Sequence, residues 1–243
     1  MYFYIVENNE FLLKDNLANF SELKFVSEIP NSNYYFIYDT EGLSFIKDSN
    51  YPKEVLHVDF LTGTLGWRMK RANHETNIKK ALGKSDKQLL IFDSTAGLLT
   101  DSLIFLSLGH KVIAVEQSKI LYSLLKDAIS RAEKKIPVLK NLMLINDNSV
   151  NVYKSISEDF DAIYIDPMFP KSKKYTKKPG KIESIKKILE LENLKDDTES
   201  LIEIFLNSNY KKIILKSPLK HRNIYSNINY QVFGKTTRFD IFL

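Results

Sequence analysis

From residue 88 to its end, the chain alternates short, continuously apolar runs with stretches of helical periodicity, and this pattern restricts the possible folds more than any other feature. The apolar runs are LLIFD, KVIAVE, NLMLIND, FDAIYID and KKIILKSP. Strands without polar alternation that are separated by helices are typical of a parallel sheet covered on both faces. The pattern therefore predicts an α/β fold with a mainly parallel sheet.

The segments between and after these runs complete the expected fold. Helices are expected at about 100–108, ended by Gly109, at 118–135 with Ser118 as the N-cap, and near 181–191 and 197–207. The chain closes with YQVFG and TRFDIFL, only a few residues apart. We therefore expect an antiparallel hairpin at one edge of the sheet.

The first 60 residues have a different pattern. YFYIV, YYFIYD, GLSFIKD and VLHVDF are short runs rich in aromatic and β-branched residues, separated by polar breaks. They predict a small, mostly β N-terminal subdomain at 1–60, followed by a main domain at 61–243. The stretch GTLGWRMKRANHET predicts a helix that ends near Gly83.

The composition excludes several classes of protein. The chain contains no Cys, which excludes disulfides, thiolate zinc sites and thiol catalysis, and its four His are scattered without the spacing of metal ligands. No apolar run reaches the roughly 18 residues that a membrane span needs, and the N-terminus does not resemble a signal peptide. We expect a cytoplasmic protein without a metal. Its oligomeric state stays open.

The charge is distributed unevenly along the chain. Residues 1–60 contain 4 basic and 10 acidic residues, a balance of −6, so the remaining 31 basic and 20 acidic residues give 61–243 a balance of +11. A positive field over the larger part favours an anionic partner such as nucleic acid. A bias in genome base composition would also produce such a Lys-rich chain.

Polar side chains at successive strand ends indicate where a ligand binds, because open α/β sheets bind ligands at the carboxyl ends of their strands. Gly97 lies in the turn after the first strand, and Glu116 ends the second strand 19 residues later. A carboxylate at this distance suits the ribose hydroxyls of a nucleoside-containing cofactor. The third strand ends in NDNS, which can bind an adenine edge, and the fourth ends at Asp166.

The turn after the first strand separates two kinds of cofactor. A dinucleotide site needs bare Gly-rich backbone against the pyrophosphate, whereas this turn has a single Gly and reaches Asp101 shortly after it. A carboxylate there would repel pyrophosphate and could receive the ammonium group of a methionine moiety. S-adenosylmethionine is therefore favoured over a dinucleotide.

The segment IYIDPMFP at 163–170 indicates the reaction. The exocyclic amine of a purine is a poor nucleophile, so methyl transfer requires its lone pair to be oriented. Asp166 can accept an N–H of the amine, and Phe169 can stack on the base. The competing interpretation is a Pro-capped turn whose Phe packs in the core. Because C5 methylation of a pyrimidine usually needs a thiolate, the lack of Cys leaves amino-group methylation available.

Basic residues near this segment suggest a phosphate-bearing substrate. KSKKYTKKPGKIESIKK at 171–187 holds 8 Lys against one Glu, and includes Lys171, Lys173 and Lys174. Arg68, Lys70 and Arg71 would extend the same surface, and Lys216, in LKSP, could meet a phosphate. A solvated charge run, and for Lys216 an edge residue extending its charge to solvent, are the alternatives.

Three stretches together resemble one family. FDSTAGLLTDSLIFLSLGHKVIAVEQS, YIDPMFPKSKK and GKTTRFDIF resemble the bacterial RsmJ family of 16S rRNA (guanine-N2)-methyltransferases, in order from about Leu56 to Leu243. The resemblance implies a Rossmann-like class I methyltransferase sheet, S-adenosylmethionine as cofactor, and one guanine amine of small-subunit rRNA as substrate. Residues 1–54 carry no such resemblance.

By position, the resemblance implies a set of cofactor-binding residues: Thr100, Asp101, Glu116, Gln117, Asn148, Ser149 and Asp166. Asp147 could replace or join Asn148 at the adenine. The chain departs from the family at three places. Leu99 and Thr100 stand where the family usually has Gly-Arg, RMKRANHET lacks the usual glycines, and Ser217 replaces the Arg of K-R-P.

The sequence therefore predicts a methyltransferase that acts on a guanine N2 amine in 16S rRNA or the small ribosomal subunit. Two alternatives stay open. One is an enzyme of the same fold that acts on a small molecule or a protein, and the other is an RNA-binding protein with a decayed cofactor site.

Overall fold

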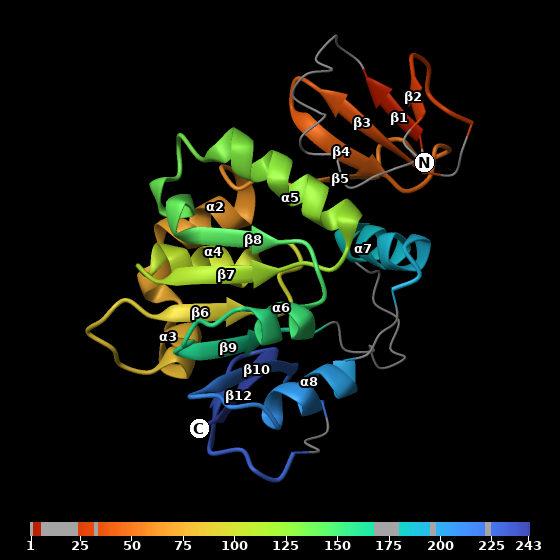
Figure 1. The fold of residues 1–243 in the computed structure, drawn as a ribbon. Helices are drawn as coiled ribbons and strands as arrows, with labels where there is room; N and C mark the ends of the chain where they lie inside the picture. The colour runs from red at the N-terminus through yellow and green to blue at the C-terminus, as the bar shows by residue number, and fades with distance from the viewer. Residues whose placement is uncertain (1, 6–23, 32–33, 168–179, 195–197, 222–224) are drawn as a thin grey trace. The chain divides into compact units, whose positions relative to one another are not determined.

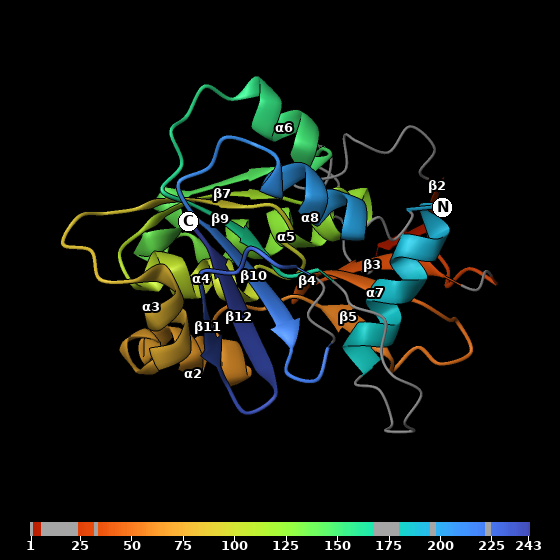
Figure 2. The same ribbon diagram turned by 90° about the horizontal axis from the view of Figure 1, so that it is seen from below.

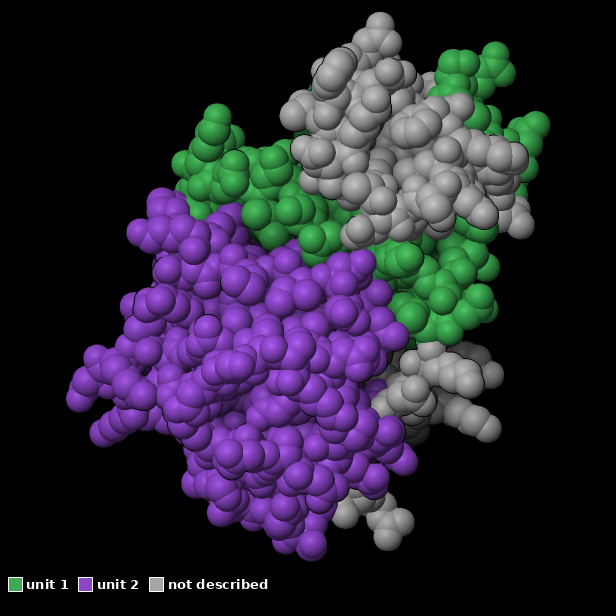
Figure 3. Space-filling model, viewed as in Figure 1, with its two compact units in different colours: residues 1–61, 118–136, 174–195 green, residues 62–117, 137–173, 196–243 purple. Residues whose placement is uncertain are grey.

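Two β-sheets organise the part of the chain that the structure, a computed structural model, describes: residues 2–5, 24–31, 34–167, 180–194, 198–221 and 225–243 (Figure 1). The chain divides into two compact units, each built on one of the sheets (Figure 3). Unit 1 comprises residues 1–61, 118–136 and 174–195, and unit 2 comprises residues 62–117, 137–173 and 196–243.

Unit 1 contains a five-stranded sheet with the order β2-β1-β3-β4-β5. Its strands are Tyr2–Ile5 (β1), Lys24–Val26 (β2), Tyr35–Asp39 (β3), Gly42–Ile46 (β4) and Val55–His57 (β5). β1 pairs in parallel with β2 and β3, whereas β4 pairs antiparallel with β3 and β5. The four strands expected from the sequence are present, and β2 is an additional one.

Two helices from later in the chain belong to unit 1, namely Lys119–Ala132 (α5) and Gly180–Leu191 (α7). α5 packs against β4 and α7 against β5. The side chain of Ser118 accepts a hydrogen bond from the Leu121 N–H, which confirms the expected N-cap. The domain boundary predicted from the sequence, at residue 60, would assign both helices to the second domain. That division into domains stays a prediction.

Unit 2 contains a seven-stranded sheet with the order β11-β12-β10-β9-β6-β7-β8. Its strands are Leu90–Asp93 (β6), Lys111–Val115 (β7), Leu142–Ile145 (β8), Ala162–Ile165 (β9), Ile213–Pro218 (β10), Tyr230–Phe233 (β11) and Thr237–Phe242 (β12). The five neighbouring strands β10, β9, β6, β7 and β8 are parallel, and β12 runs antiparallel to β10 and β11. The mainly parallel sheet and its C-terminal hairpin are confirmed.

Helices cover both faces of this sheet (Figure 2). They are Gly63–Lys70 (α2), Thr76–Leu82 (α3), Thr100–Ser107 (α4), Ser149–Ser155 (α6) and Thr198–Leu206 (α8), with 3-10 turns at Ala72–His74 (η1) and Pro137–Asn141 (η2). α6 and α8 lie on one face, and α2, α3 and α4 on the other. No helix among these described segments is long and apolar enough to cross a membrane.

The apolar runs fill the two faces in alternation. Phe92, Ile163 and Ile165 belong to the buried cluster that includes Val152 of α6 and Phe205 of α8. Tyr164, between two members of that cluster, points to the other face and meets the ring of Phe105 in α4, with the ring centroids 4.9 Å apart. Because every strand residue is needed on one face or the other, the runs contain no polar alternation.

The segment before β6 differs from the single helix that was expected up to Gly83. Arg71 leaves helical geometry with φ −118°, so α2 ends there, and α3 begins only after η1. Arg68 Nε lies 2.6 Å from Glu75 Oε1. This ion pair across the break stabilises the two short helices in place of one long helix.

Candidate active site

Three acidic residues gather at the carboxyl edge of the parallel strands in unit 2. Asp93 ends β6, Asp166 follows β9, and Asp101 lies in the first turn of α4. β6 is paired with β7 on one side and β9 on the other, so the order of the strands along the chain reverses here. Ligands of open α/β sheets bind at such a point.

Lys216 joins two of these acids. Its Nζ lies 2.6 Å from Asp101 Oδ2 and 2.7 Å from Asp166 Oδ2. Because Leu215 of β10 pairs with Ile165 of β9, Lys216 lies level with Asp166 at the edge of the sheet. Lys216 lies within β10, and its ammonium group forms ion pairs with both carboxylates.

Asp101 is 6% exposed and has three donors. Tyr164 Oη donates to its Oδ2 at 2.6 Å, beside the Lys216 ammonium, and Arg68 Nη2 donates to its Oδ1 at 3.5 Å. Burial acts to raise the pKa of Asp101, but Lys216, Tyr164 and Arg68 outweigh burial and leave this pKa lowered. Asp101 is therefore a carboxylate at neutral pH, and a methionine ammonium would be a third cation beside it.

Asp166 is the accessible member of the cluster, with 36% of its side chain exposed. Its backbone N–H donates to Thr95 Oγ1 at 2.7 Å, which ties the end of β9 to the turn after β6. Burial raises the pKa of Asp166, Lys216 acts against this rise, and Asp101 adds to it. Of its two carboxylate oxygens, Oδ2 is the one that faces Lys216.

The Gly97 turn and Glu116, predicted as two parts of one cofactor site, are in direct contact. The Gly97 N–H donates to Glu116 Oε2 at 2.9 Å, and Gly97 has φ +53°, a conformation that favours glycine. Asn146 Nδ2 donates to the carbonyls of Glu116 at 2.7 Å and Gln117 at 3.3 Å, which fixes the end of β7. These contacts hold the Glu116 carboxylate beside the turn.

Asn148 and Ser149 lie where the third strand passes into α6. Asn148 is the N-cap, because its Oδ1 accepts hydrogen bonds from the N–H groups of Val150 at 3.0 Å and Asn151 at 3.4 Å. Ser149 is buried in the first turn of the helix. Since the Asn148 oxygen is used in capping, its amide nitrogen is the group that could reach an adenine.

Several predicted positions are less fully placed by the structure. Thr100 and Gln117 are exposed, and Arg68 is half-buried between Glu75 and Asp101. Phe169, Lys171, Lys173 and Lys174 lie outside the described residues. The binding roles of all these residues stay predictions. Among the described residues, no group of His, Asp and Glu is arranged to hold a metal ion.

Two buried residues of the site were not singled out from the sequence. Tyr164 looked like one of several strand residues in IYID, and only its packing on the α4 face brings its hydroxyl to Asp101. Asp93 is 2% exposed and accepts hydrogen bonds from Ser102 Oγ at 2.5 Å and the Thr95 N–H at 3.1 Å. Its place at the strand end in LLIFD was the available signal.

Asp93 is expected to make stability depend on pH. Burial raises its pKa to about 7, with Ser102 and Thr95 acting against the rise and Asp101 and Asp166 adding to it. Between its unfolded value near 4 and about 7, the folded state binds more protons, so stability falls as pH rises. From pH 5 to pH 7, the free energy of unfolding of the wild type should fall by about 2 kcal/mol relative to that of Asp93→Asn, which keeps the size of the side chain and can still accept the Thr95 N–H.

Urea unfolding of both proteins at pH 5, 6, 7 and 8 measures this difference, with Asp86→Asn, at an exposed position, as the control. Parallel pH profiles for the wild type and Asp93→Asn would contradict a raised pKa at Asp93.

The sequence matches a family model described as "Putative SAM-dependent methyltransferase" over residues 18–243, so the match extends into residues 1–54, where no resemblance was expected. A curated relative named ribosomal RNA small subunit methyltransferase J, from Desulfotalea psychrophila, is 29% identical over 251 residues, covering 98% of this chain and 94% of the relative. The protein of that name from Francisella tularensis subsp. novicida is 29% identical over 239 residues, covering 95% of each.

A solved structure also resembles the whole chain. The SAM-dependent methyltransferase NGO1261 from Neisseria gonorrhoeae superposes with a TM-score of 0.66 at 24% identity, covering 100% of this chain and 96% of the other. This likeness confirms the Rossmann-like methyltransferase fold that was expected from the sequence.

Proposed function

We propose that this chain, which belongs to the family of S-adenosylmethionine-dependent methyltransferases, transfers a methyl group to the N2 amine of a guanine in 16S rRNA. The observation that carries the proposal is the Asp166 carboxylate, accessible at the strand end and held by Lys216. Relatives named small-subunit rRNA methyltransferases support the substrate class. Such a substrate would place the reaction in the cytoplasm.

The cofactor is S-adenosylmethionine, and it supplies an electrophilic methyl group on a sulfonium cation. Glu116 would bind the ribose hydroxyls, with the Gly97 N–H holding one of its oxygens. The Gly97–Asp101 turn would face the methionine end, and the Asn148 amide the adenine. The acidic strand ends suit a cationic cofactor, because the carboxylates attract a positive charge and would repel an anionic group.

Asp166 would orient the acceptor amine. Lys216 fixes Oδ2 of the carboxylate at 2.7 Å, so Oδ1 is the oxygen that can accept an N–H of the guanine amine. In that orientation the amine lone pair would face the methyl group that S-adenosylmethionine would supply, with S-adenosylhomocysteine as the leaving product. The amine afterwards loses one proton, for which Asp166, with its pKa raised by burial, is the adjacent base.

A comparison of possible methyl acceptors tests the proposal. The protein is incubated with methyl-labelled S-adenosylmethionine and, in parallel, with small-subunit particles lacking late methylations, free rRNA and total cell protein. Label in particles or rRNA supports an RNA substrate. Label in protein alone overturns it, and the absence of both label and cofactor binding would indicate a decayed cofactor site.

Replacing Glu116 by glutamine is expected to weaken cofactor binding about tenfold, because a charge-assisted hydrogen bond to ribose is lost. The Gln side chain can still accept the Gly97 N–H through its oxygen, so the turn should keep its shape. Isothermal calorimetry with S-adenosylmethionine measures the change. Glu158→Gln, at an exposed position, is the control, and equal affinity of wild type and Glu116→Gln would exclude the ribose role.

A further inference from the structure

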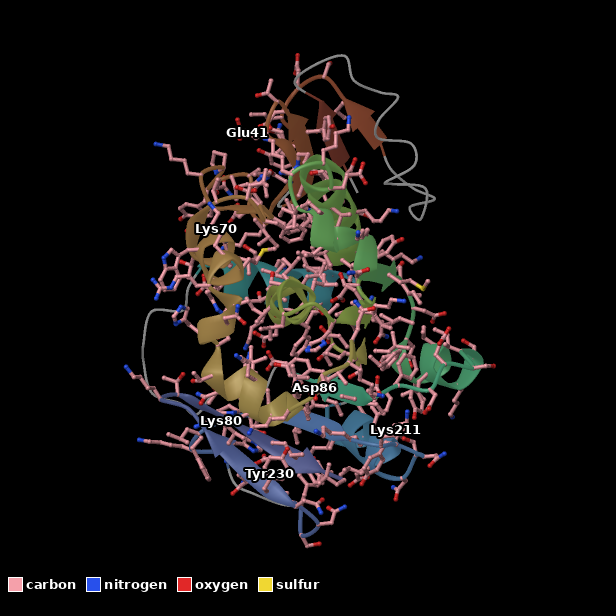
Figure 4. All side chains as sticks on the ribbon, turned by 90° about the vertical axis from the view of Figure 1, so that its left-hand side faces the viewer. Glu41, Lys70, Lys80, Asp86, Lys211 and Tyr230 are labelled. Atoms are coloured by element: carbon pink, nitrogen blue, oxygen red, sulfur yellow. The ribbon has the colours of Figure 1, made fainter. Side chains whose placement is uncertain are left out.

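The outward side of α2 carries an aromatic ring among cations. Trp67 is 58% exposed, and the guanidinium carbon of Arg71 lies 4.9 Å from its ring centroid. Lys70 and Arg71 are exposed as well, and no acidic residue occurs in the first turn of α2. Figure 4 faces this side of unit 2 and labels Lys70 at the end of the helix. Residues three and four apart share a helix face, so the three side chains are neighbours.

Ordinary helix chemistry explains only part of this arrangement. Cations are favoured at the carboxyl end of a helix, where the backbone carbonyls carry partial negative charge, and this accounts for Lys70 and Arg71. It does not account for Trp67, whose large apolar surface would stabilise the fold more if it were buried. A cation stacked on an exposed aromatic ring is an arrangement that binds nucleic-acid bases and phosphates.

The same helix contacts the candidate active site. Arg68, directly after Trp67, turns inward and donates to Asp101 at 3.5 Å and to Glu75 at 2.6 Å. Asp101 in turn shares Lys216 with Asp166. All of these residues belong to unit 2, so Trp67 is one helix position from the network that holds Asp166.

We propose that Trp67, Lys70 and Arg71 form an RNA-binding surface, on which Trp67 stacks an unpaired base near the target guanine while the two cations bind phosphates. The inference rests on the proposed function and names the surface that would bind the rRNA beside the site. A base extracted for methylation leaves neighbouring bases unstacked, and an exposed indole ring can compensate for part of that loss. Arg71, stacked on one face of the Trp67 ring, would hold the ring in its orientation.

The chain has one Trp, so the Trp emission, excited selectively over that of the 13 Tyr, reports on Trp67 alone. The full chain is titrated with a fluorescein-labelled, single-stranded RNA of mixed sequence, about 12 nucleotides long. RNA binding should quench the Trp emission at the same concentrations that raise the anisotropy of the RNA label. Binding without any change in Trp emission would overturn the stacking of a base on Trp67.

Variants separate stacking from charge. Trp67→Ala should bind the RNA about tenfold more weakly, whereas Trp67→Phe should retain most of the affinity. Lys70→Gln with Arg71→Gln should reduce the dependence of binding on salt, because fewer counterions are released. Tyr51→Ala, at a ring that is 62% exposed in unit 1, is the control and should bind as the wild type does.

Methyl transfer to rRNA, measured in parallel, distinguishes a failure of the RNA-binding surface from a failure of the proposed function. If the wild type methylates rRNA and Trp67→Ala both binds and methylates equally well, the surface is wrong while the function stands. If the wild type methylates no RNA and the titration shows no binding, the proposed function fails, and the surface fails with it.

Discussion

Asp166→Ala is expected to lower the rate of methyl transfer to rRNA by a factor of about 10²–10³ or more, while the fold stays intact. In the proposed reaction its carboxylate orients the amine and then accepts a proton, two contributions of this general size. The fold should persist, because Asp166 is partly exposed and Lys216 retains its contact with Asp101 at 2.6 Å.

Single-turnover kinetics with saturating cofactor measure the effect, and circular dichroism reports on the fold. Asp159→Ala is a matched control, because this exposed acid lies just before the start of β9, whereas Asp166 follows its end. An Asp166→Ala variant that is folded and transfers methyl groups at the wild-type rate would exclude the assigned role.

Arg238→Met is expected to destabilise the fold by about 3–5 kcal/mol, because it leaves the buried Asp240 carboxylate without its cation. Arg238 Nε donates to both carboxylate oxygens of Asp240, at 2.9 and 3.1 Å, and both side chains are buried. Arg238 Nη1 also donates to the backbone carbonyls of Pro218, Leu219 and His221, of which His221 is nearest at 2.7 Å. These bonds tie β12 to the chain that leaves β10 just after Lys216.

Urea unfolding measures this loss, with Lys235→Met, at an exposed position on the same hairpin, as the control. The double variant Arg238→Met with Asp240→Leu should recover part of the stability, because it removes the unpaired charge as well. A cost below about 1 kcal/mol for Arg238→Met would show that Asp240 finds another partner.

Much of the fold could be predicted because its signals are local. Each apolar run of unit 2 became a strand, Gly109 follows α4, and Ser118 caps α5, since strand propensity and capping depend on neighbouring residues. The resemblance to the RsmJ family likewise agrees with the relatives that the chain matches. In the sheet, β12 and not β11 lies next to β10, although β11 comes first in the chain. This order depends on long-range pairing, for which the sequence has no local signal.

The site could be predicted only in part, for the same physical reason. Gly97 and Glu116 were expected together because a strand, a helix and a second strand fix their separation. The contacts of Lys216 with Asp101 and Asp166 join residues 115 and 50 positions apart, so spacing could not indicate them. Similarly, the short α6 gave no periodic signal, and its cap on Asn148 was missed.

Leu99 shows how tertiary packing can override local preference. It stands where the family usually has Gly and adopts φ +57°, a left-handed conformation that costs a non-glycine residue about 1–2 kcal/mol. Its side chain is completely buried, which offsets that cost by a similar amount. Burial of the Leu99 side chain therefore stabilises the turn before α4.

The nucleoside that receives the methyl group tests the central claim most directly. Small-subunit rRNA is incubated with methyl-labelled S-adenosylmethionine and either the wild type or Asp166→Ala, digested to nucleosides and separated by liquid chromatography with mass spectrometry. The account predicts labelled N2-methylguanosine with the wild type and almost none with Asp166→Ala. Label in any other nucleoside, or equal N2-methylguanosine from both proteins, would contradict it.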